Sequence, residues 1–296
     1  MSHKRALLIV NPNSRSADSA DMEKGIARLE AAGLTVNCVE SDNPAQSIHA
    51  IEAQQTTTDM VILAGGDGTL HSTVDVLHRC QLPLAVLPLG TGNDFARSLG
   101  IPLELEPAFE VIAGGHSRLV DLGRVNGKLF LNAASVGLGV QVSRSLTAEV
   151  KRDLGVLSYL KALLESLSRS KSFRVSLDVD GRHFRLRSIQ LAVGNGRFYG
   201  GGNVIHEEAA IDEGLLHLYS IEPQGFWQLL LLAPLWRNGR HRQSANTFTV
   251  SGRRFSIRTS PSLEMYTDGE PATHTPAEME VLPEALEVIA PRETEI

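Results

Sequence analysis

The chain has 296 residues, 42% of them hydrophobic, which is enough to bury a sizeable core and to build two domains of ordinary size. Its longest apolar stretch, near residues 229–234, is far shorter than the roughly 20 residues of a membrane-spanning helix. The formal net charge of −6 gives no overall attraction to nucleic acid, and we expect no nucleic-acid partner. Cys38 and Cys80 are not spaced as a metal or redox pair and the N-terminus lacks a signal-peptide pattern, so we expect a cytoplasmic protein.

Up to about residue 120, short apolar runs alternate with amphipathic stretches. This pattern predicts a largely parallel sheet covered by helices. A helix is expected over Asp21–Ala32, because apolar residues recur there at helical spacing and Gly33 follows as a stop. Another is expected where Leu70, Val74 and Leu77 recur. The expected strands are Leu7–Val10, Val36–Val39, Met60–Ala64 and Pro83–Leu87.

From Gly123 onward the pattern changes to strands joined by tight turns. Asn126-Gly127 and Asp180-Gly181 each lie between strand-favouring runs, as in two-residue hairpins. Helices are expected over Lys151–Ser168 and Gly225–Trp236. We therefore expect an α/β domain of residues 1–122 and a mainly antiparallel β domain of residues 123–283, with residues from about 284 to 296 returning to the first. No Pro-rich or Gly/Ser-rich linker separates them, so the domains are expected to share a tight cleft.

The segment AGGDGTL, residues 64–70, carries the strongest chemical signal. It joins an apolar strand to a helix, where glycine N–H groups and the positive helix N-terminus can approach a phosphate closely. Asp67 is suited to hold Mg²⁺ beside those phosphates. A valine at Gly66 is expected to fill the phosphate space and abolish nucleotide binding with little unfolding. The alternative is a plain strand-to-helix turn capped by Asp67 or Thr69, and no P-loop Gly-Lys-Ser/Thr follows.

A second segment, PLGTGNDFAR at residues 88–97, also follows an apolar strand and opens a short helix. Thr91 and the N–H groups of Gly90 and Gly92 suit phosphate or ribose, and Asp94 brings a second carboxylate toward the metal. The alternative is a helix capped by Asn or Asp after a loop. From this segment alone the two readings have equal weight.

These motifs resemble the bacterial diacylglycerol kinase and YegS-like lipid kinase family, which shares its nucleotide fold with sphingosine, NAD and phosphofructo kinases. The resemblance covers nearly the whole chain. It also includes NPNS at 11–14, VDLG at 120–123, NAASVGLG at 132–139, Lys151-Arg152 with Gly155 and Tyr159, GNG at 194–196, GGG at 200–202, GLL at 214–216 and DGE at 268–270. It implies an N-terminal nucleotide-binding domain like that of NAD kinase and phosphofructokinase. ATP and substrate are then expected to meet between this domain and the β-rich one.

The resemblance also implies roles for individual residues. The nucleotide would be held by Asn11, Ser41, Gly65, Gly66, Asp67, Gly68, Thr69, Leu70, Gly90, Thr91 and Asn93. Mg²⁺ would lie among Asp67, Asp94 and Glu270 with support from Asp121, and a second, structural Mg²⁺ or Ca²⁺ at Ala210, Asp212, Glu213 and Leu215. Asp268 would be the general base that takes the acceptor hydroxyl proton. The alternative for Asp268-Gly269 is an ordinary turn, which this tripeptide alone favours by roughly two to one.

The chain departs from the family pattern at three places. Arg15 stands where the family usually has Gly, so the loop near the nucleotide is expected to be stiffer. His71-Ser72 replaces the usual Asn-Glu, so any role of that acidic residue is lost or transferred. Glu213, instead of Asp, precedes Gly214, and Asp212 stands one residue earlier, so either carboxylate is expected to serve the second metal.

We therefore expect an ATP- and Mg²⁺-dependent kinase that phosphorylates a hydroxyl of a membrane lipid such as diacylglycerol or a phosphatidylglycerol-like lipid. Peripheral membrane contact is expected during activity, and an oligomer is compatible with the sequence. Residues 226–242 combine aromatic, aliphatic and basic side chains, which favours either an interfacial membrane helix or a buried helix with a basic end. The alternatives are a kinase of a soluble substrate such as NAD, a nucleotide-sensing module without turnover, and a binding protein whose glycine turns are purely structural.

Overall fold

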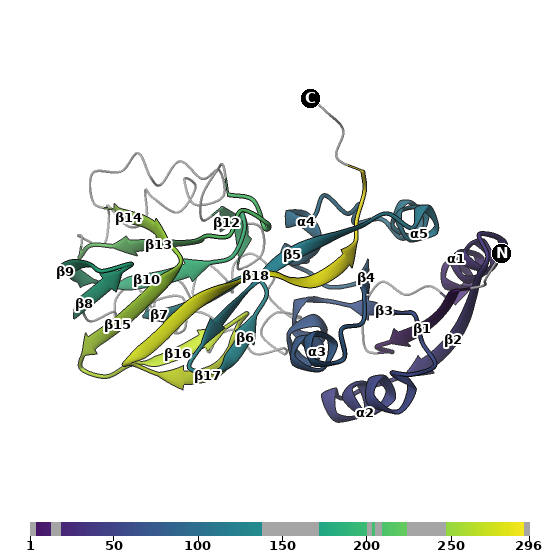
Figure 1. Cartoon of the computed structure of the whole chain (residues 1–296), viewed down its shortest axis with the longest axis horizontal. Coiled ribbons are helices and arrows are strands. Elements are labelled where there is room, and N and C mark those ends of the chain that lie inside the picture. The colour runs from purple at the N-terminus through teal and green to yellow at the C-terminus, as the bar shows by residue number, and fades with distance from the viewer. Residues whose placement is uncertain are drawn as a thin grey trace, which may run out of the picture.

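The structure is a computed structural model that describes residues 4–12, 19–137, 172–199, 203–204, 209–223 and 247–292. An α/β half and a β half lie side by side along the long axis of the molecule (Figure 1). The helices expected over Lys151–Ser168 and Gly225–Trp236, the segment 226–242 and Arg15 lie outside the described residues.

The N-terminal half is built on four parallel strands in the order β2-β1-β3-β4. The strands are β1 (Lys4–Val10), β2 (Leu34–Glu40), β3 (Met60–Gly65) and β4 (Leu84–Pro88), and the helices are α1 (Ser19–Ala31), α2 (Pro44–Gln54), α3 (Asp67–Cys80), α4 (Asp94–Ser98) and α5 (Leu105–Gly114). Helices α1 and α5 pack together on one side of the sheet, and α2 and α3 on the other (Figure 1). Strands β3 and β4 are buried at every residue because helices cover both faces. The four predicted strands and the two helices predicted with them are confirmed.

The C-terminal half contains an antiparallel six-stranded sheet in the order β14-β13-β10-β7-β16-β17, which packs against strands β15, β8 and β9. Its elements are β6 (Lys128–Phe130), β7 (Ala133–Gly137), β8 (Phe173–Val179), β9 (Arg182–Ser188), β10 (Gln190–Gly194), β11 (Phe198–Tyr199), β12 (Asn203–Val204), β13 (Leu216–Ile221), β14 (Thr247–Gly252), β15 (Arg254–Ser260), β16 (Glu264–Thr267), β17 (Glu270–His274) and β18 (Ala277–Ile289). Strand β5 (Ser117–Val125) begins in the N-terminal core and runs into this half. Both predicted hairpin turns are confirmed, since Asn126 and Asp180 have φ of 45° and 50° and a glycine follows each.

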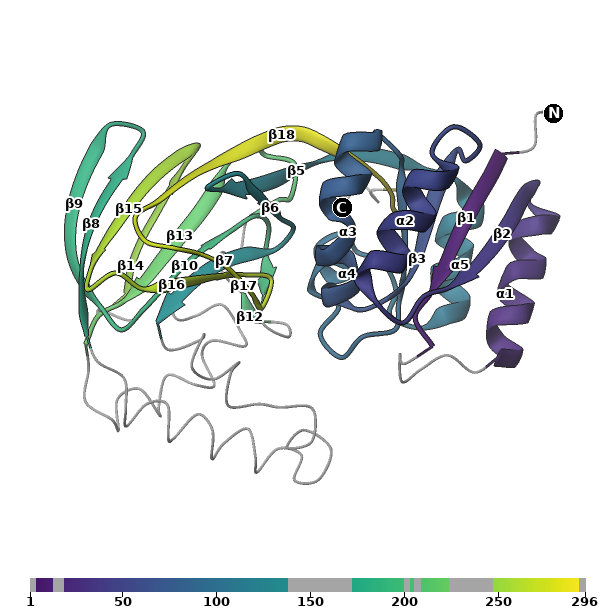
Figure 2. The same cartoon turned by 90° about the horizontal axis from the view of Figure 1, so that it is seen from below.

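Strand β18 joins the two halves, as Figure 2 shows. It pairs with β15 and β5, and near its end Val288 pairs with Leu84 of β4, so one ten-stranded sheet passes through the whole molecule. A bulge between Leu282 and Leu286 bends the strand at the crossing, where Glu284 has a φ of 52°. Continuous pairing across this crossing positions the loops of one half against the other.

Candidate active site

The two glycine-rich turns lie in contact at the carboxyl edge of the parallel sheet. They follow β3 and β4, which are hydrogen-bonded neighbours. A Cβ atom added to Gly66 would lie 2.9 Å from the Cα of Gly90, and one added to Gly90 would lie 2.5 Å from the Cα of Gly66. The two backbones therefore approach more closely than side chains allow. The expectation that a valine at Gly66 causes little unfolding is wrong, because that side chain would press on the backbone of the second turn.

Asn93 holds the second turn in shape. Its backbone is left-handed, with φ of 52°, and its side chain is buried. The side chain accepts a hydrogen bond from the N–H of Gly90 at 2.9 Å and donates one to the Gly90 carbonyl at 2.8 Å. The Gly90 N–H, which was expected to bind phosphate, therefore donates its hydrogen bond to Asn93 within the loop. Thr91, at the tip, is exposed.

Asp67 ties the first turn to the second and to the β half. Its carboxylate accepts hydrogen bonds from the N–H groups of Asp94 and Phe95, both at 3.2 Å, so it caps helix α4 and not its own helix. The side-chain amide of Asn132, which precedes β7, donates to the same carboxylate at 3.4 Å. The alternative in which Asp67 or Thr69 caps helix α3 is therefore wrong, because Gly66 is the N-cap of α3 and no side-chain hydrogen bond caps that helix.

The donor atoms around Asp67 suit an oxygen-seeking cation that nucleotide phosphates help to hold. Asp94 is buried beside it, and the side-chain oxygen of Asn132 is buried without a hydrogen-bond partner in the described structure. Mg²⁺ commonly takes only one or two carboxylates and completes its shell with phosphates and water. In the described part of the chain, no three His, Cys, Asp or Glu residues are grouped to hold a metal. The protein atoms thus fit Mg²⁺ only together with a phosphate ligand.

Asp268 is at once a hairpin turn residue and a buried anchor. With φ of 48°, and Gly269 at 92°, it forms the tight turn between β16 and β17. Its side chain is 0% exposed, and Oδ2 lies 3.0 Å from Nδ1 of His71. The carboxylate accepts further hydrogen bonds from the N–H groups of Leu131, Asn132 and Ala133, at 2.8, 2.8 and 3.0 Å. The turn reading of Asp268-Gly269 is therefore confirmed, both carboxylate oxygens already have protein partners, and the role of Asp268 as general base stays a prediction.

His71, like Asn132, lies at this site although the sequence did not predict it there. Its departure from the family pattern was the available signal. The side chain is 19% exposed. Although burial by itself lowers the pKa of His71, the hydrogen bond and the charge of Asp268 raise the pKa above its ordinary value. Glu270 and Asp75 add smaller contributions in the same direction.

Asp121 lies with the predicted second metal site instead of with Asp67. Its carboxylate accepts hydrogen bonds from the N–H of Gly214 at 2.6 Å and from the N–H of Glu284, in the β18 bulge, at 2.9 Å. Burial raises the pKa of Asp121 above its ordinary value although these two hydrogen bonds lower it, and the charges of Asp212 and Glu213 add smaller increases. Asp121 therefore links the β18 crossing to the loop that carries those two carboxylates.

Basic side chains already partner the carboxylates of that loop. The Glu213 carboxylate lies 2.7 Å from Nε2 of His217 and accepts a hydrogen bond from the N–H of Ala210 at 2.9 Å. Asp212 lies 3.6 Å from the guanidinium of Arg118. As arranged, the described residues do not fit a second metal ion, because these carboxylates point to protein partners.

The remaining predicted residues surround the turns. Ser41 is buried in the loop before α2, where its hydroxyl donates to the Asn43 carbonyl at 2.9 Å. Asn11 follows β1, and its N–H donates to the Ala64 carbonyl at 3.2 Å. Glu270 is exposed at the start of β17. Leu70 is buried in α3, Gly68 has open space where a Cβ would lie, and the Thr69 side chain closes over Gly65.

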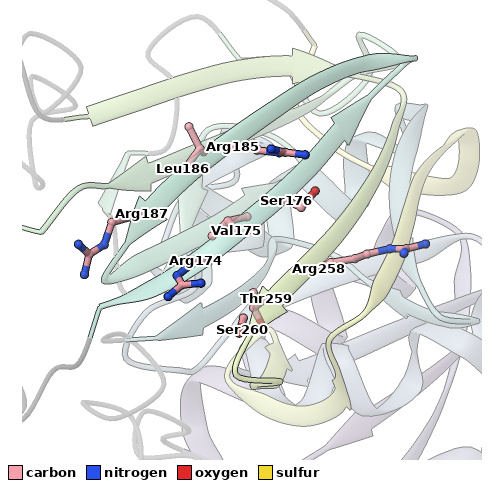
Figure 3. Close-up of a pocket in the computed structure, with 9 residues that line it drawn as sticks. All are labelled: Arg174, Val175, Ser176, Arg185, Leu186, Arg187, Arg258, Thr259 and Ser260. Atoms are coloured by element: carbon pink, nitrogen blue, oxygen red, sulfur yellow. The ribbon is translucent and has the colours of Figure 1, made fainter.

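An arginine-rich open pocket lies away from this site, on the outer face of β8, β9 and β15 (Figure 3). None of the predicted site residues lines it. Arg174 and Arg187 are opposite each other across β8 and β9, with Arg185 and Arg258 nearby. Strand β9 is the edge of its sheet, and charged side chains at an edge discourage pairing with another chain. We interpret Arg185 and Arg187, which lie on β9, as edge protection.

The parallel sheet, the touching glycine turns and the carboxylate that the β half brings toward them define a two-domain kinase. Residues 5–125 match the sequence model of the diacylglycerol kinase catalytic domain, and residues 132–290 match that of the YegS C-terminal NAD kinase beta sandwich-like domain. The chain therefore belongs to the bacterial diacylglycerol kinase and YegS-like lipid kinase family, and the predicted fold class is confirmed.

Curated relatives and solved structures agree with this family. The chain is 29% identical over 294 residues to diacylglycerol kinases of Staphylococcus aureus strains JH9 and Newman, covering 98% of this chain and 93% of theirs. A crystal structure described as a candidate diacylglycerol kinase of Bacillus anthracis is 27% identical, with a TM-score of 0.83 and coverage of 98% of this chain and 96% of that one. In the described residues, no helix has the length and apolar character needed to cross a membrane.

Proposed function

We propose that this protein is an ATP- and Mg²⁺-dependent kinase that transfers the γ-phosphate to a hydroxyl of diacylglycerol or of a phosphatidylglycerol-like lipid. One observation carries the proposal: the β half brings Asp268 and Asn132 to the touching Gly66 and Gly90 turns. Family membership supports a lipid acceptor, since the curated relatives are named diacylglycerol kinases.

The proposed nucleotide site uses the N-terminus of α3. Backbone N–H groups around Gly66 and Gly68, together with the positive end of the helix, favour phosphate oxygens. Asp67, Asp94 and Glu270 would hold Mg²⁺, which, when bound, neutralises charge on the phosphate oxygens. Thr91 would contact the nucleotide from the second turn. Positioning and neutralisation are the main demands of phosphoryl transfer, and these residues meet both.

The acceptor would approach from the side of the β16–β17 turn. There the negative charge of Asp268 favours removal of the acceptor hydroxyl proton. The backbone of residues 131–133 fixes this carboxylate, so it keeps one position during turnover. Asn132 links the carboxylate to Asp67, and through it the acceptor side to the metal side.

The first prediction tests the proposal as a whole. With labelled ATP and Mg²⁺, we expect phosphate transfer to diacylglycerol or phosphatidylglycerol in vesicles or mixed micelles, and no transfer when Mg²⁺ is chelated. We also propose peripheral membrane contact during activity, which predicts that the rate follows the lipid surface supplied and not the bulk lipid concentration.

Three outcomes would favour another function. Equal or faster phosphorylation of NAD in the absence of lipid would indicate a soluble-substrate kinase. Mg²⁺-dependent ATP binding without transfer to any component of an extracted lipid mixture would indicate a nucleotide sensor. Absence of ATP binding with and without Mg²⁺ would leave the glycine turns a purely structural role.

A further inference from the structure

His71 and Asp268 form a contact between the two halves at the centre of the proposed site. His71 lies on α3, one turn beyond the phosphate-binding turn, and Asp268 lies in the β16–β17 turn. Nδ1 of His71 is 3.0 Å from Oδ2 of Asp268. The two residues are 197 positions apart in the sequence, so the contact depends on the packing of the two halves.

The surroundings of the pair determine which member can meet a substrate. The Asp268 side chain is 0% exposed and has three backbone N–H partners besides the imidazole, whereas His71 is 19% exposed. Its Nε2 atom has no hydrogen-bond partner among the described residues. Of the two side chains, only the imidazole therefore has a free polar atom.

The Asp268 carboxylate also determines which neutral tautomer of the His71 imidazole is present. When Nδ1–H donates to Asp268, the neutral ring carries its lone pair on Nε2, which then accepts a proton. A carboxylate behind a histidine orients the ring and stabilises the imidazolium that forms. The same charge raises the pKa of His71 above its ordinary value, which strengthens the ring as a base near neutral pH.

We propose that His71, oriented by Asp268, is the catalytic base of the phosphoryl transfer. Nε2 takes the acceptor hydroxyl proton while the hydroxyl oxygen bonds to the γ-phosphorus of ATP. The bond from that phosphorus to the bridging oxygen breaks, and its electron pair leaves with ADP. The proton passes from Nε2 to solvent before the next turnover. The proposal rests on the kinase function proposed above, and it gives a use to the residue that departs from the family pattern.

His71→Asn is the sharpest variant, because its side-chain N–H can still donate to Asp268 but the amide cannot take a proton. We expect kcat to fall by about 10² to 10⁴ with ATP affinity unchanged. The matched control is His78→Asn on the same helix, where Nδ1 lies 2.7 Å from the Ala285 carbonyl, and it should keep normal turnover. Near-normal kcat for His71→Asn beside an active wild type would overturn the role of His71 alone.

The pH profile separates a base from a structural contact. Asp268 and Glu270 face His71 from the opposite half, and Asp75 from its own helix. Because their charges raise the pKa of His71, kcat/KM should increase with pH and level off above the ordinary value for histidine. This increase of kcat/KM with pH should be absent in His71→Asn. NMR titration of His71 in the free wild-type protein should show the same raised pKa. If kcat/KM of His71→Asn still increases with pH in the same way, another residue is the base.

A double variant completes the test. If the two residues share one proton path, Asp268→Asn combined with His71→Asn should be little worse than His71→Asn alone. Losses that multiply would show two separate roles and contradict the proposal. Absence of wild-type turnover on every lipid would instead overturn the kinase function itself, and the role of His71 with it.

Discussion

Asp268→Asn is expected to lower kcat by about 10² to 10⁴ while ATP binding changes little. Asparagine retains the shape of the side chain and tolerates the left-handed backbone, where φ is 48°. It loses the negative charge beside His71, and with it the stabilisation of a protonated imidazole. Steady-state kinetics in lipid micelles across a Mg²⁺ titration measure the loss.

The variant should also lose stability, and the size of that loss is a separate test of the structure. One amide oxygen can still accept from Asn132 and Ala133, but the amide nitrogen would face the N–H of Leu131. An unsatisfied buried donor costs about 1–3 kcal/mol, so chemical denaturation should show a decrease of that order. Kinetics should therefore be measured where the variant is fully folded.

Glu270→Gln is the matched control for Asp268→Asn. Glu270 lies two residues away and is exposed, so its replacement should leave stability unchanged. As a proposed neighbour of Mg²⁺, its loss should raise the Mg²⁺ concentration needed for half-maximal rate. Near-normal kcat for Asp268→Asn would remove that residue from the proton path. A collapse of kcat for Glu270→Gln at saturating Mg²⁺ would transfer the base role to Glu270.

Gly66→Val is expected to abolish ATP binding and to lower the free energy of unfolding by about 1–3 kcal/mol, as overpacking commonly does. The added Cβ would lie 2.9 Å from the Cα of Gly90, and backbone atoms cannot rotate away as a side chain can. The two turns would separate, which removes the close approach of their backbones that a phosphate site needs. Isothermal titration with ATP and denaturant unfolding measure both effects.

Gly68→Ala provides the matched control in the same turn. A Cβ at Gly68 would have no atom within 4 Å, and alanine favours the helix that begins there. Its stability should therefore equal or exceed that of the wild type. Wild-type ATP affinity in Gly66→Val would show that the contact of the two turns does not form the nucleotide site.

Local patterns predicted those elements whose cause is local. Apolar runs gave β3 and β4, and asparagine or aspartate before glycine gave the two hairpins, because backbone preference and burial act over a few residues. The sequence patterns did not lead us to predict helix α2, although two signals mark where it begins. Asn43 caps it through a hydrogen bond from the N–H of Gln46 at 3.0 Å, and Pro44 opens it. The helix has only a weak apolar stripe, and recurring apolar residues were the main basis for predicting helices.

The candidate site, like the fold, has features that the sequence predicts and features that only the tertiary structure shows. The sequence by itself determined that Gly66 and Gly90 lie in strand-to-helix turns and that Asp268 lies in a hairpin, because these conformations depend on neighbouring residues. Only the tertiary structure decided that the two turns touch and that His71 binds Asp268. Such contacts join residues tens to hundreds of positions apart, and sheet pairing across the β18 crossing sets them. The spacing of neighbouring residues in the sequence does not indicate how these strands pair.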